Sequence, residues 1–213
     1  MLFPLLVTAL QAQDICVTGE LQPVPGPTIC QQGETHMLVG TGTNAVFLRS
    51  NSVNLQASVG NIVTVVGQDI GLLCRVLDVT SVVDPAPVVT VSCGSPSPGC
   101  PIRVATQGPG LGFAMLAIAF DSGFTPLGCG TLPGELSGTV MLGNVAELLL
   151  AGQTSTGRID STLAIPSDNA LIGTNVGFQG AHLTLGRVGP LRLSNIVWVQ
   201  LAPFLPPCAP LNC

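Results

Sequence analysis

The sequence predicts an all-β fold in two domains, and three observations support this prediction. Short runs of Val, Leu, Ile and Thr recur along the chain, separated by Gly, Pro, Asn and Asp, at the spacing typical of barrels and sandwiches. Helical periodicity is nearly absent, because only 144–150 and 167–172 favour a helix, each of a turn or two. Apolar residues make up 46% of the 213-residue chain, which is enough for a sizeable core.

The first twelve residues have the features of a signal peptide (1–12). Their apolar segment is too short to span a bilayer and ends in small and polar residues at Ala12 and Gln13. We therefore expect cleavage after Ala12 and a mature protein that is secreted or held at the cell surface; an N-terminal strand is the alternative. The longest later apolar run, 113–120, is too short for a membrane helix, so we expect no membrane insertion.

The first domain is expected over 13–91. Gly60 suits a turn that needs a positive φ, and Gly67 suits a bulge or a strand end. Alternation of apolar and polar residues in Val63–Val65 and Val76–Thr80 marks half-buried strands. The expected strands are 15–21, 36–40, 45–49, 62–68 and 75–83.

The glycine placement in this domain also carries a resemblance. A leucine at Leu55 is followed by the turn Val59-Gly60, then by Val63–Gly67, and then by the final strand Val76–Val82. This pattern resembles small exported OB-fold domains of bacteria. The resemblance implies a curved five-stranded barrel whose exposed face binds oligomers.

The second domain is expected over 92–201, with the boundary between residues 85 and 100. The composition breaks at Asp84–Pro87 and again at Gly94–Gly99, and a Pro-rich disulfide tail follows at 202–213. The expected strands are 102–107, 112–120, 138–142, 157–165, 176–185 and 191–201.

Two segments of the second domain carry a further resemblance. Thr156–Gly173 contains a strand that ends in Ile165-Pro166 and an Asx-Ala-Leu-x-Gly turn, and Leu191–Val199 contains Leu-Ser-Asn. Both segments resemble a C-terminal β domain of secreted proteins from Planctomycetes-like bacteria. The resemblance implies an antiparallel β-sandwich in which Asp168 caps a single helical turn, and it implies no particular activity. The expected architecture is therefore an N-terminal OB-like small barrel followed by a C-terminal antiparallel β-sandwich.

An even number of cysteines in an exported chain predicts disulfides, so we expect at least three bridges. Local spacing favours Cys93–Cys100 and Cys208–Cys213, and Cys16–Cys30 is a third option. A zinc site is the competing interpretation, but the chain has no C-x-x-C motif. The eight disulfide candidates are Cys16, Cys30, Cys74, Cys93, Cys100, Cys129, Cys208 and Cys213.

Charge argues against nucleic acid as a partner. The chain has six arginines, no lysine and eleven acidic residues, which gives a net charge of −5. Such a surface cannot neutralise a row of phosphates, and it equally disfavours anionic membranes. A chain so poor in charge is also prone to self-association.

No pattern in the sequence predicts catalysis, a cofactor or a metal. A serine hydrolase needs a base beside its nucleophile, whereas His36 and His182 are expected at surface or interface positions of strands. Asp121, Glu135 and Asp160 could form a carboxylate pair only if the fold brought them together. A hydrolase site assembled in this way remains a third hypothesis.

Two groups of residues are candidates for binding. Phe47, Arg49 and Arg75 form a candidate ligand face, with the Gly40–Gly42 loop at its edge; this loop matches a phosphate-binding motif but precedes a strand pattern rather than a helix. Arg187, Arg192 and Trp198 form a candidate interface, with a core tryptophan as the alternative for Trp198. We expect a non-enzymatic structural or assembly module that binds copies of itself or other envelope proteins. The alternative is an OB-type protein that binds a glycan or a peptide.

Overall fold

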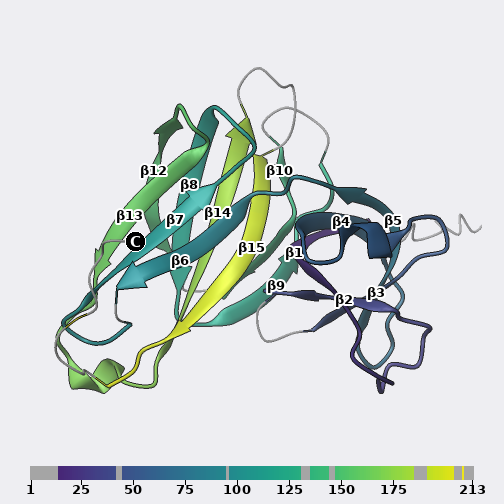
Figure 1. The fold of residues 1–213 in the computed structure, drawn as a ribbon, viewed down its shortest axis with the longest axis horizontal. Coiled ribbons are helices and arrows are strands. Elements are labelled where there is room, and N and C mark those ends of the chain that lie inside the picture. The colour runs from purple at the N-terminus through teal and green to yellow at the C-terminus, as the bar shows by residue number, and fades with distance from the viewer. Residues whose placement is uncertain are drawn as a thin grey trace, which may run out of the picture.

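The computed structural model describes residues 14–41, 45–94, 96–130, 135–143, 147–184, 191–203 and 208. Over these residues the protein is all-β, with a closed barrel at one end and three further sheets beside it (Figure 1). The predicted signal peptide, Arg187 and most of the predicted tail lie outside the described residues.

The barrel consists of five strands in the closed order β1-β2-β3-β5-β4. Neighbouring strands are antiparallel except β3 and β5, which are parallel. All five strands that the sequence predicts in this region are found. Their bounds are β1 (Ile15–Pro23), β2 (His36–Val39), β3 (Val46–Arg49), β4 (Ile62–Asp69) and β5 (Arg75–Val83), and a short 3-10 turn, η1 (Leu55–Ser58), lies between β3 and β4.

Both glycine predictions in the barrel are confirmed. Gly60 has a φ of +85° in the turn before β4. The ladder between β4 and β5 shifts register between Val66 and Gly67, which is the expected bulge. A Cβ at Gly67 would lie 2.5 Å from the carbonyl oxygen of Asp78, so only glycine lets the two strands approach this closely.

After the barrel the chain enters a set of three sheets. Their strand orders are β10-β15-β14-β8-β12, β13-β7-β6 and β11-β9. The bounds are β6 (Val88–Gly94), β7 (Pro101–Gln107), β8 (Gly112–Ala119), β9 (Ser122–Pro126), β10 (Leu136–Ser137), β11 (Thr139–Leu142), β12 (Glu147–Thr154), β13 (Arg158–Ala164), β14 (Asn175–Thr184) and β15 (Leu191–Gln200).

Four of these strands are not among the strands expected from the sequence: β6, β9, β10 and β12. The helix expected at 144–150 is wrong where it is described, because β12 begins at Glu147 and pairs with β8 along its length. The run of Leu148, Leu149 and Leu150 lacks alternation, and periodicity cannot tell such a run from a buried helix. The turn at 167–172 is confirmed as η2 (Asn169–Leu171), where Asp168 accepts a hydrogen bond from the backbone N–H of Ala170.

One apolar core is built from residues of the three-stranded and five-stranded sheets. Val89, Ile102 and Val104 come from β6 and β7, while Leu116 and Phe178 come from β8 and β14, and all five are buried. Residues of these two sheets therefore share one core.

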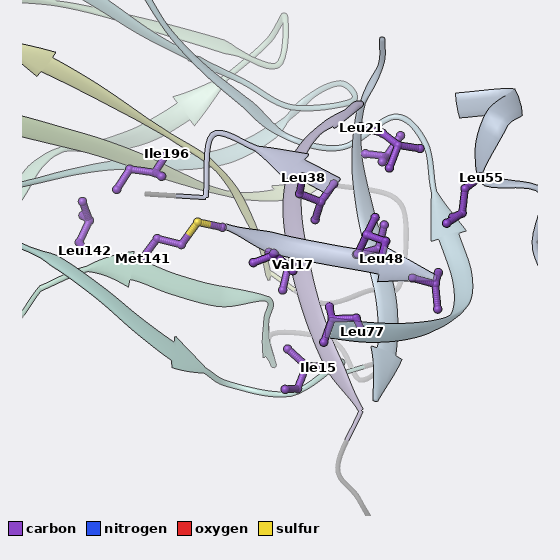
Figure 2. Packing of buried hydrophobic residues seen from close by; sticks show 14 of the residues in the cluster. Ile15, Val17, Leu21, Leu38, Leu48, Leu55, Leu77, Met141, Leu142 and Ile196 are labelled. Atoms are coloured by element: carbon purple, nitrogen blue, oxygen red, sulfur yellow. The ribbon is translucent and has the colours of Figure 1, made fainter. Parts of the chain in front are cut away.

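A second core joins the barrel to the rest of the molecule. Barrel residues such as Val17 and Leu48 cluster with Met141 and Leu142 of β11 and with Ile196 of β15. Figure 2 shows Met141 extending toward Val17 from outside the barrel. The interior of the barrel is thus completed by side chains from the second half of the chain.

Three disulfides are found, which confirms the expected minimum, but the local pairings are wrong. Cys16 pairs with Cys129, Cys30 with Cys74, and Cys100 with Cys208. These bonds exclude Cys93–Cys100, Cys208–Cys213 and Cys16–Cys30, because Cys100, Cys208, Cys16 and Cys30 are each bonded to another cysteine. The cysteines that pair are 44 to 113 positions apart, so their pairing depends on which distant segments the fold brings together. The six bonded cysteines form disulfides and not a zinc site.

In the part of the chain that the structure describes, no helix is long and apolar enough to cross a membrane.

Candidate functional site

The candidate ligand face is present in part, on the outside of the barrel. Phe47 and Arg49 alternate on β3 with the buried Val46 and Leu48, so both point away from the core, and both are half-buried. Arg49 donates from Nη1 to the carbonyl oxygen of Gln32 at 3.1 Å, and its Nη2 lies 3.4 Å from Oδ2 of Asp78.

Arg75 does not join this face. Its register partner on β3 is Val46, whose side chain lies in the core, so Arg75 projects toward the opposite side of the sheet from Phe47. There its guanidinium stacks 3.6 Å from the ring centroid of Phe124, and its Nη1 lies 3.3 Å from Oδ2 of Asp69. Arg75 therefore links the end of the barrel to β9.

Three buried polar atoms in the described part of the barrel have no hydrogen-bond partner. They are Nε of Arg49 itself, Oε1 of Gln32 and Oγ1 of Thr28, the last two from the segment between β1 and β2. Buried polar atoms are normally hydrogen-bonded, so a water or a polar ligand would be stabilised here.

The Gly40 loop is a structural junction. Its carbonyl oxygen accepts a hydrogen bond from the N–H of Ile196 at 3.0 Å, which ties β2 to β15. Residues 42–44 of the loop lie outside the described residues. The element that follows is β3, a strand, so the helix that a phosphate-binding loop requires is replaced by a strand, as the sequence predicts.

The candidate interface is only partly described. Trp198 of β15 is half-buried and packs against the core that joins the barrel to the sheets. A Cβ at Gly177 would lie 2.7 Å from the Trp198 ring, so the indole rests on the backbone of the neighbouring strand. Arg192 is half-buried at the start of β15, opposite His182 on β14.

Both histidines are buried, so the expectation of surface or interface positions is wrong. His36 Nδ1 lies 2.8 Å from Oγ1 of Thr35, and His182 Nε2 lies 2.7 Å from Oγ1 of Thr106. Burial lowers the pKa of His182 from 6.5 to about 4. The imidazole is therefore neutral at physiological pH and serves as a hydrogen-bonding group inside the fold.

The acidic residue Asp160 is held by two arginines on the outer face of the three-stranded sheet. Its Oδ1 lies 2.8 Å from Nη2 of Arg158 and 3.2 Å from Nε of Arg103. The hydrogen bond from Arg158 holds the pKa of this carboxyl below its ordinary value, and the charge of Arg103 acts in the same direction. Asp160 is thus a carboxylate that stays ionised, which is the opposite of what a general acid needs. Among the described residues, no group of three or more His, Cys, Asp or Glu is placed to hold a metal ion.

The Leu-Ser-Asn motif has a structural role. Ser194 Oγ accepts a hydrogen bond from the N–H of Gly180 at the bulge in β14. The Asn195 amide accepts from the N–H of Val89 at 2.8 Å and donates to the Val89 carbonyl at 3.3 Å, so it pairs with β6 as a neighbouring strand would.

The side chain of Gln179 likewise hydrogen-bonds to the backbone of β11, a role that the sequence analysis did not predict. Its Oε1 accepts from the N–H of Met141 at 2.9 Å, while its Nε2 donates to the carbonyls of Thr139 and Ser194. One buried amide therefore joins three strands. No local signal marks this glutamine, because its partners are distant in sequence.

The three most exposed large apolar side chains of the described residues lie beside one disulfide. Ile29 is 81% exposed, Leu72 90% and Leu73 84%. Ile29 precedes Cys30 and Leu73 precedes Cys74, and these cysteines are bonded to each other. We call Ile29, Leu72, Leu73 and this disulfide the stapled tip. Apolar residues between the expected strands 62–68 and 75–83 were the available signal, since turns are usually polar.

Local contacts hold the stapled tip in place. Asp69 Oδ1 accepts from the N–H of Gly71 at 3.0 Å, and Asp69 Oδ2 binds Arg75, so one carboxylate fixes both ends of the β4–β5 turn. On the other loop, Gln32 is bound by Arg49 and by Glu34, whose Oε2 accepts from the Gln32 N–H. The loops that carry Ile29, Leu72 and Leu73 are therefore held in place by hydrogen bonds and by the disulfide.

Comparison of this chain with family models and with curated proteins gives no match.

Proposed function

We propose that this protein is a secreted, non-catalytic module of the cell envelope or extracellular matrix that acts by assembling with copies of itself or with other envelope proteins. The stapled tip carries the proposal. Exposed aliphatic groups of this size are unfavourable in water unless a partner covers them, and contiguous ones mark interaction sites. A disulfide and a paired carboxylate reduce the ordering entropy that binding would otherwise cost.

The remaining features agree with a binding module. Three disulfides indicate an oxidising compartment, which supports export. Two of the side chains that could perform acid–base chemistry have structural partners: the buried, neutral His182 is bound to Thr106, and Asp160 is paired with two arginines.

We further infer that the barrel is OB-like and that the three-stranded and five-stranded sheets form a sandwich over their shared core. We also propose that the two halves of the chain are related to the exported OB-fold domains and to the Planctomycetes-type domains.

Size-exclusion chromatography with light scattering tests the proposal. The oxidised mature protein is expected to form species larger than a monomer, and their proportion should rise with protein concentration. A protein that remains monomeric at the highest attainable concentration would contradict self-assembly.

A second candidate function is glycan or peptide binding at Phe47 and Arg49. The unpartnered Nε of Arg49 and Oε1 of Gln32 favour it, because these two residues are in contact and sugar hydroxyls would satisfy both atoms. In calorimetric titrations with neutral and acidic oligosaccharides, Arg49→Gln should remove binding. Arg103→Gln is the matched control, because Arg103 is similarly exposed and also paired with an aspartate. Tight, salt-sensitive binding of single-stranded nucleic acid would overturn this candidate.

A further inference from the structure

Strand β13 is an outer strand of the three-stranded sheet, and one of its edges is open. Within that sheet it pairs only with β7, in one unbroken register from Arg158–Gln107 to Ala164–Pro101. Its even-numbered residues are exposed and its odd-numbered residues are half-buried. In Figure 1 the strand lies on the side of the molecule away from the barrel. A strand with one open edge can pair with a further strand.

The hydrogen bonds to β7 show which backbone groups face the open edge. The N–H of Gly108 donates to the carbonyl of Gly157, and the N–H of Ile165 donates to the carbonyl of Cys100. Both pairs continue the β13–β7 register, in which hydrogen-bonded and non-hydrogen-bonded pairs alternate. The odd-numbered residues of β13 therefore bond to β7, and the backbone groups of the even-numbered residues point outward.

Most of these outward groups are unpaired. The carbonyl of Arg158 accepts a hydrogen bond from Thr154 Oγ1 at 2.8 Å. In the described part of the chain, the N–H and carbonyl groups of Asp160, Thr162 and Ala164 have no hydrogen-bond partner. Donors and acceptors spaced along an extended backbone are matched by another extended backbone, so the edge fits a β-strand.

The other sheet edges among the described residues are interrupted or short. The register shifts within the β6–β7, β8–β12 and β9–β11 pairs, and β10 contains only two residues. Proteins protect sheet edges against pairing by bulges and short strands, and β13 has neither. Its two charged residues, Arg158 and Asp160, are paired with each other at 2.8 Å, so this edge presents no isolated charge.

The outward residues of β13 match a second copy of the same strand. In an antiparallel pair whose two-fold axis passes through Ser161, Asp160 of one copy lies opposite Thr162 of the other. Arg158 likewise lies opposite Ala164. Every outward N–H then meets an outward carbonyl, and the Thr162 hydroxyl faces the Asp160 carboxylate of the other copy. No like charges lie opposite each other.

Neighbouring registers are less favourable. Moving the axis to Asp160 places this carboxylate opposite its own copy, where like charges repel. Moving the axis to Thr162 places Arg158 opposite Pro166, which has no N–H to donate. The residues of the strand therefore select the axis at Ser161.

We propose that two copies of this protein pair edge to edge through β13, antiparallel about Ser161, so that their three-stranded sheets become one continuous sheet. The contact uses the same surface on both copies and therefore closes as a dimer. The inference rests on self-assembly as the proposed function and identifies a contact that does not involve the stapled tip.

Cysteine cross-linking tests the position of the axis. The Cα atoms of a non-hydrogen-bonded pair, such as Ser161 and its copy, lie about 4.5 Å apart, within the range of a disulfide. Ser161→Cys should therefore form an intermolecular disulfide under mild oxidation, mapped by mass spectrometry of the non-reduced dimer. Thr162→Cys is the matched control, because the two Thr162 residues are diagonal neighbours about 7–8 Å apart and should not link.

A proline substitution tests the backbone pairing. Thr162→Pro removes an outward N–H that β7 does not use, and an edge strand tolerates proline at such a position, so the monomer should fold. The dimer loses one hydrogen bond from each copy and leaves two carbonyls unpaired. Its dissociation constant in sedimentation velocity should therefore rise about 100-fold. Thr162→Val is the control that retains the N–H, and it should raise this constant by less than about tenfold.

The outcomes separate this contact from the proposed function. A wild type that assembles, while Thr162→Pro has no effect and Ser161→Cys does not cross-link, would overturn the β13 contact and leave self-assembly in place. Ser161→Cys that links to a different secreted protein and never to its own copy would also overturn the proposal. A wild type that stays monomeric at the highest attainable concentration would overturn self-assembly itself.

Discussion

In this protein, buried side chains hydrogen-bond to the backbone of strands that are not paired with the side chain's own strand. Asn195 bonds both the N–H and the carbonyl of Val89, and Thr139 Oγ1 donates to the carbonyl of Cys16 at 2.6 Å. Thr18 Oγ1 likewise donates to the carbonyl of Leu193 at 2.9 Å, across 175 residues of sequence. Such side chains satisfy buried backbone groups that would otherwise cost free energy.

At this scale His182 predicts a pH-dependent stability. Its folded pKa of about 4 lies below the ordinary 6.5, so between these values the unfolded chain binds more protons than the folded chain. The free energy of unfolding should therefore fall as the pH drops from 6.5 to 4, by up to about 3 kcal/mol. Urea unfolding at several pH values measures this slope.

The variant His182→Gln keeps a hydrogen-bonding group beside Thr106 but does not titrate. Its stability should be flatter than that of the wild type over this pH window. His36→Gln is the matched control and should retain the slope, because His182 is still present. An unchanged slope in His182→Gln would show that another group is responsible.

At the scale of elements, strands were predicted correctly where apolar and polar residues alternate. They were missed where apolar residues follow one another without alternation or where the strand has only a few residues. All five barrel strands follow from alternation and glycine placement. β10 contains two residues and could not be predicted, because its parallel pairing with β15 is a tertiary contact. β6 follows the Pro-rich break at 85–87, which masked its Val-Val-Thr-Val pattern.

The attachment of β11 gives an element-scale prediction. β11 pairs through a backbone ladder with β9, and Gln179 supplies its bonds to the five-stranded sheet. Gln179→Leu would leave the Met141 N–H and the Thr139 and Ser194 carbonyls buried without partners. We expect a loss of about 3 kcal/mol in the free energy of unfolding, measured by denaturant titration. Gln153→Leu, at an exposed position of β12, should change it by less than about 0.5 kcal/mol; equal effects of the two substitutions would contradict the role of Gln179.

At the scale of the whole molecule, the barrel and the sheets share a core and a covalent bond. The Cys16–Cys129 disulfide joins β1 to the segment after β9, and Met141 is fully buried in the cluster that fills the barrel. The sequence predicts two domains with a boundary between residues 85 and 100. The shared core instead favours a single unfolding unit, because separation would expose the end of the barrel.

Met141→Ala tests this coupling. It should lower the free energy of unfolding by about 2–4 kcal/mol, since it leaves a cavity at a fully buried position. Amide hydrogen exchange should show an equal loss of protection in β3 and β5 of the barrel and in β14. Met141 belongs to none of these strands, because it lies on β11. Met115→Ala, at a half-buried position of β8, is the control with a smaller effect. Loss of protection confined to the sheets would indicate two independent units.

The candidate site was predictable only in its local part. Phe47 and Arg49 share a face because residues two apart on a strand point the same way. Arg75 belongs to another strand, and its side was set by the parallel register of β3 and β5. The stapled tip required both the Cys30–Cys74 pairing and the exposure of Leu72 and Leu73, neither of which local spacing contains.

The sequence by itself determined the all-β class, most strands, the glycine turns and the presence of disulfides, because these depend on alternation, φ preference and composition within a few residues. The tertiary structure decided which cysteines pair and that both histidines are buried. It also decided that the side chains of Gln179 and Asn195 hydrogen-bond to the backbone of neighbouring strands. It also decided that the barrel is completed by Met141. The physical reason is that burial and pairing depend on which segments meet in three dimensions, and in this fold the decisive contacts join residues up to 175 positions apart.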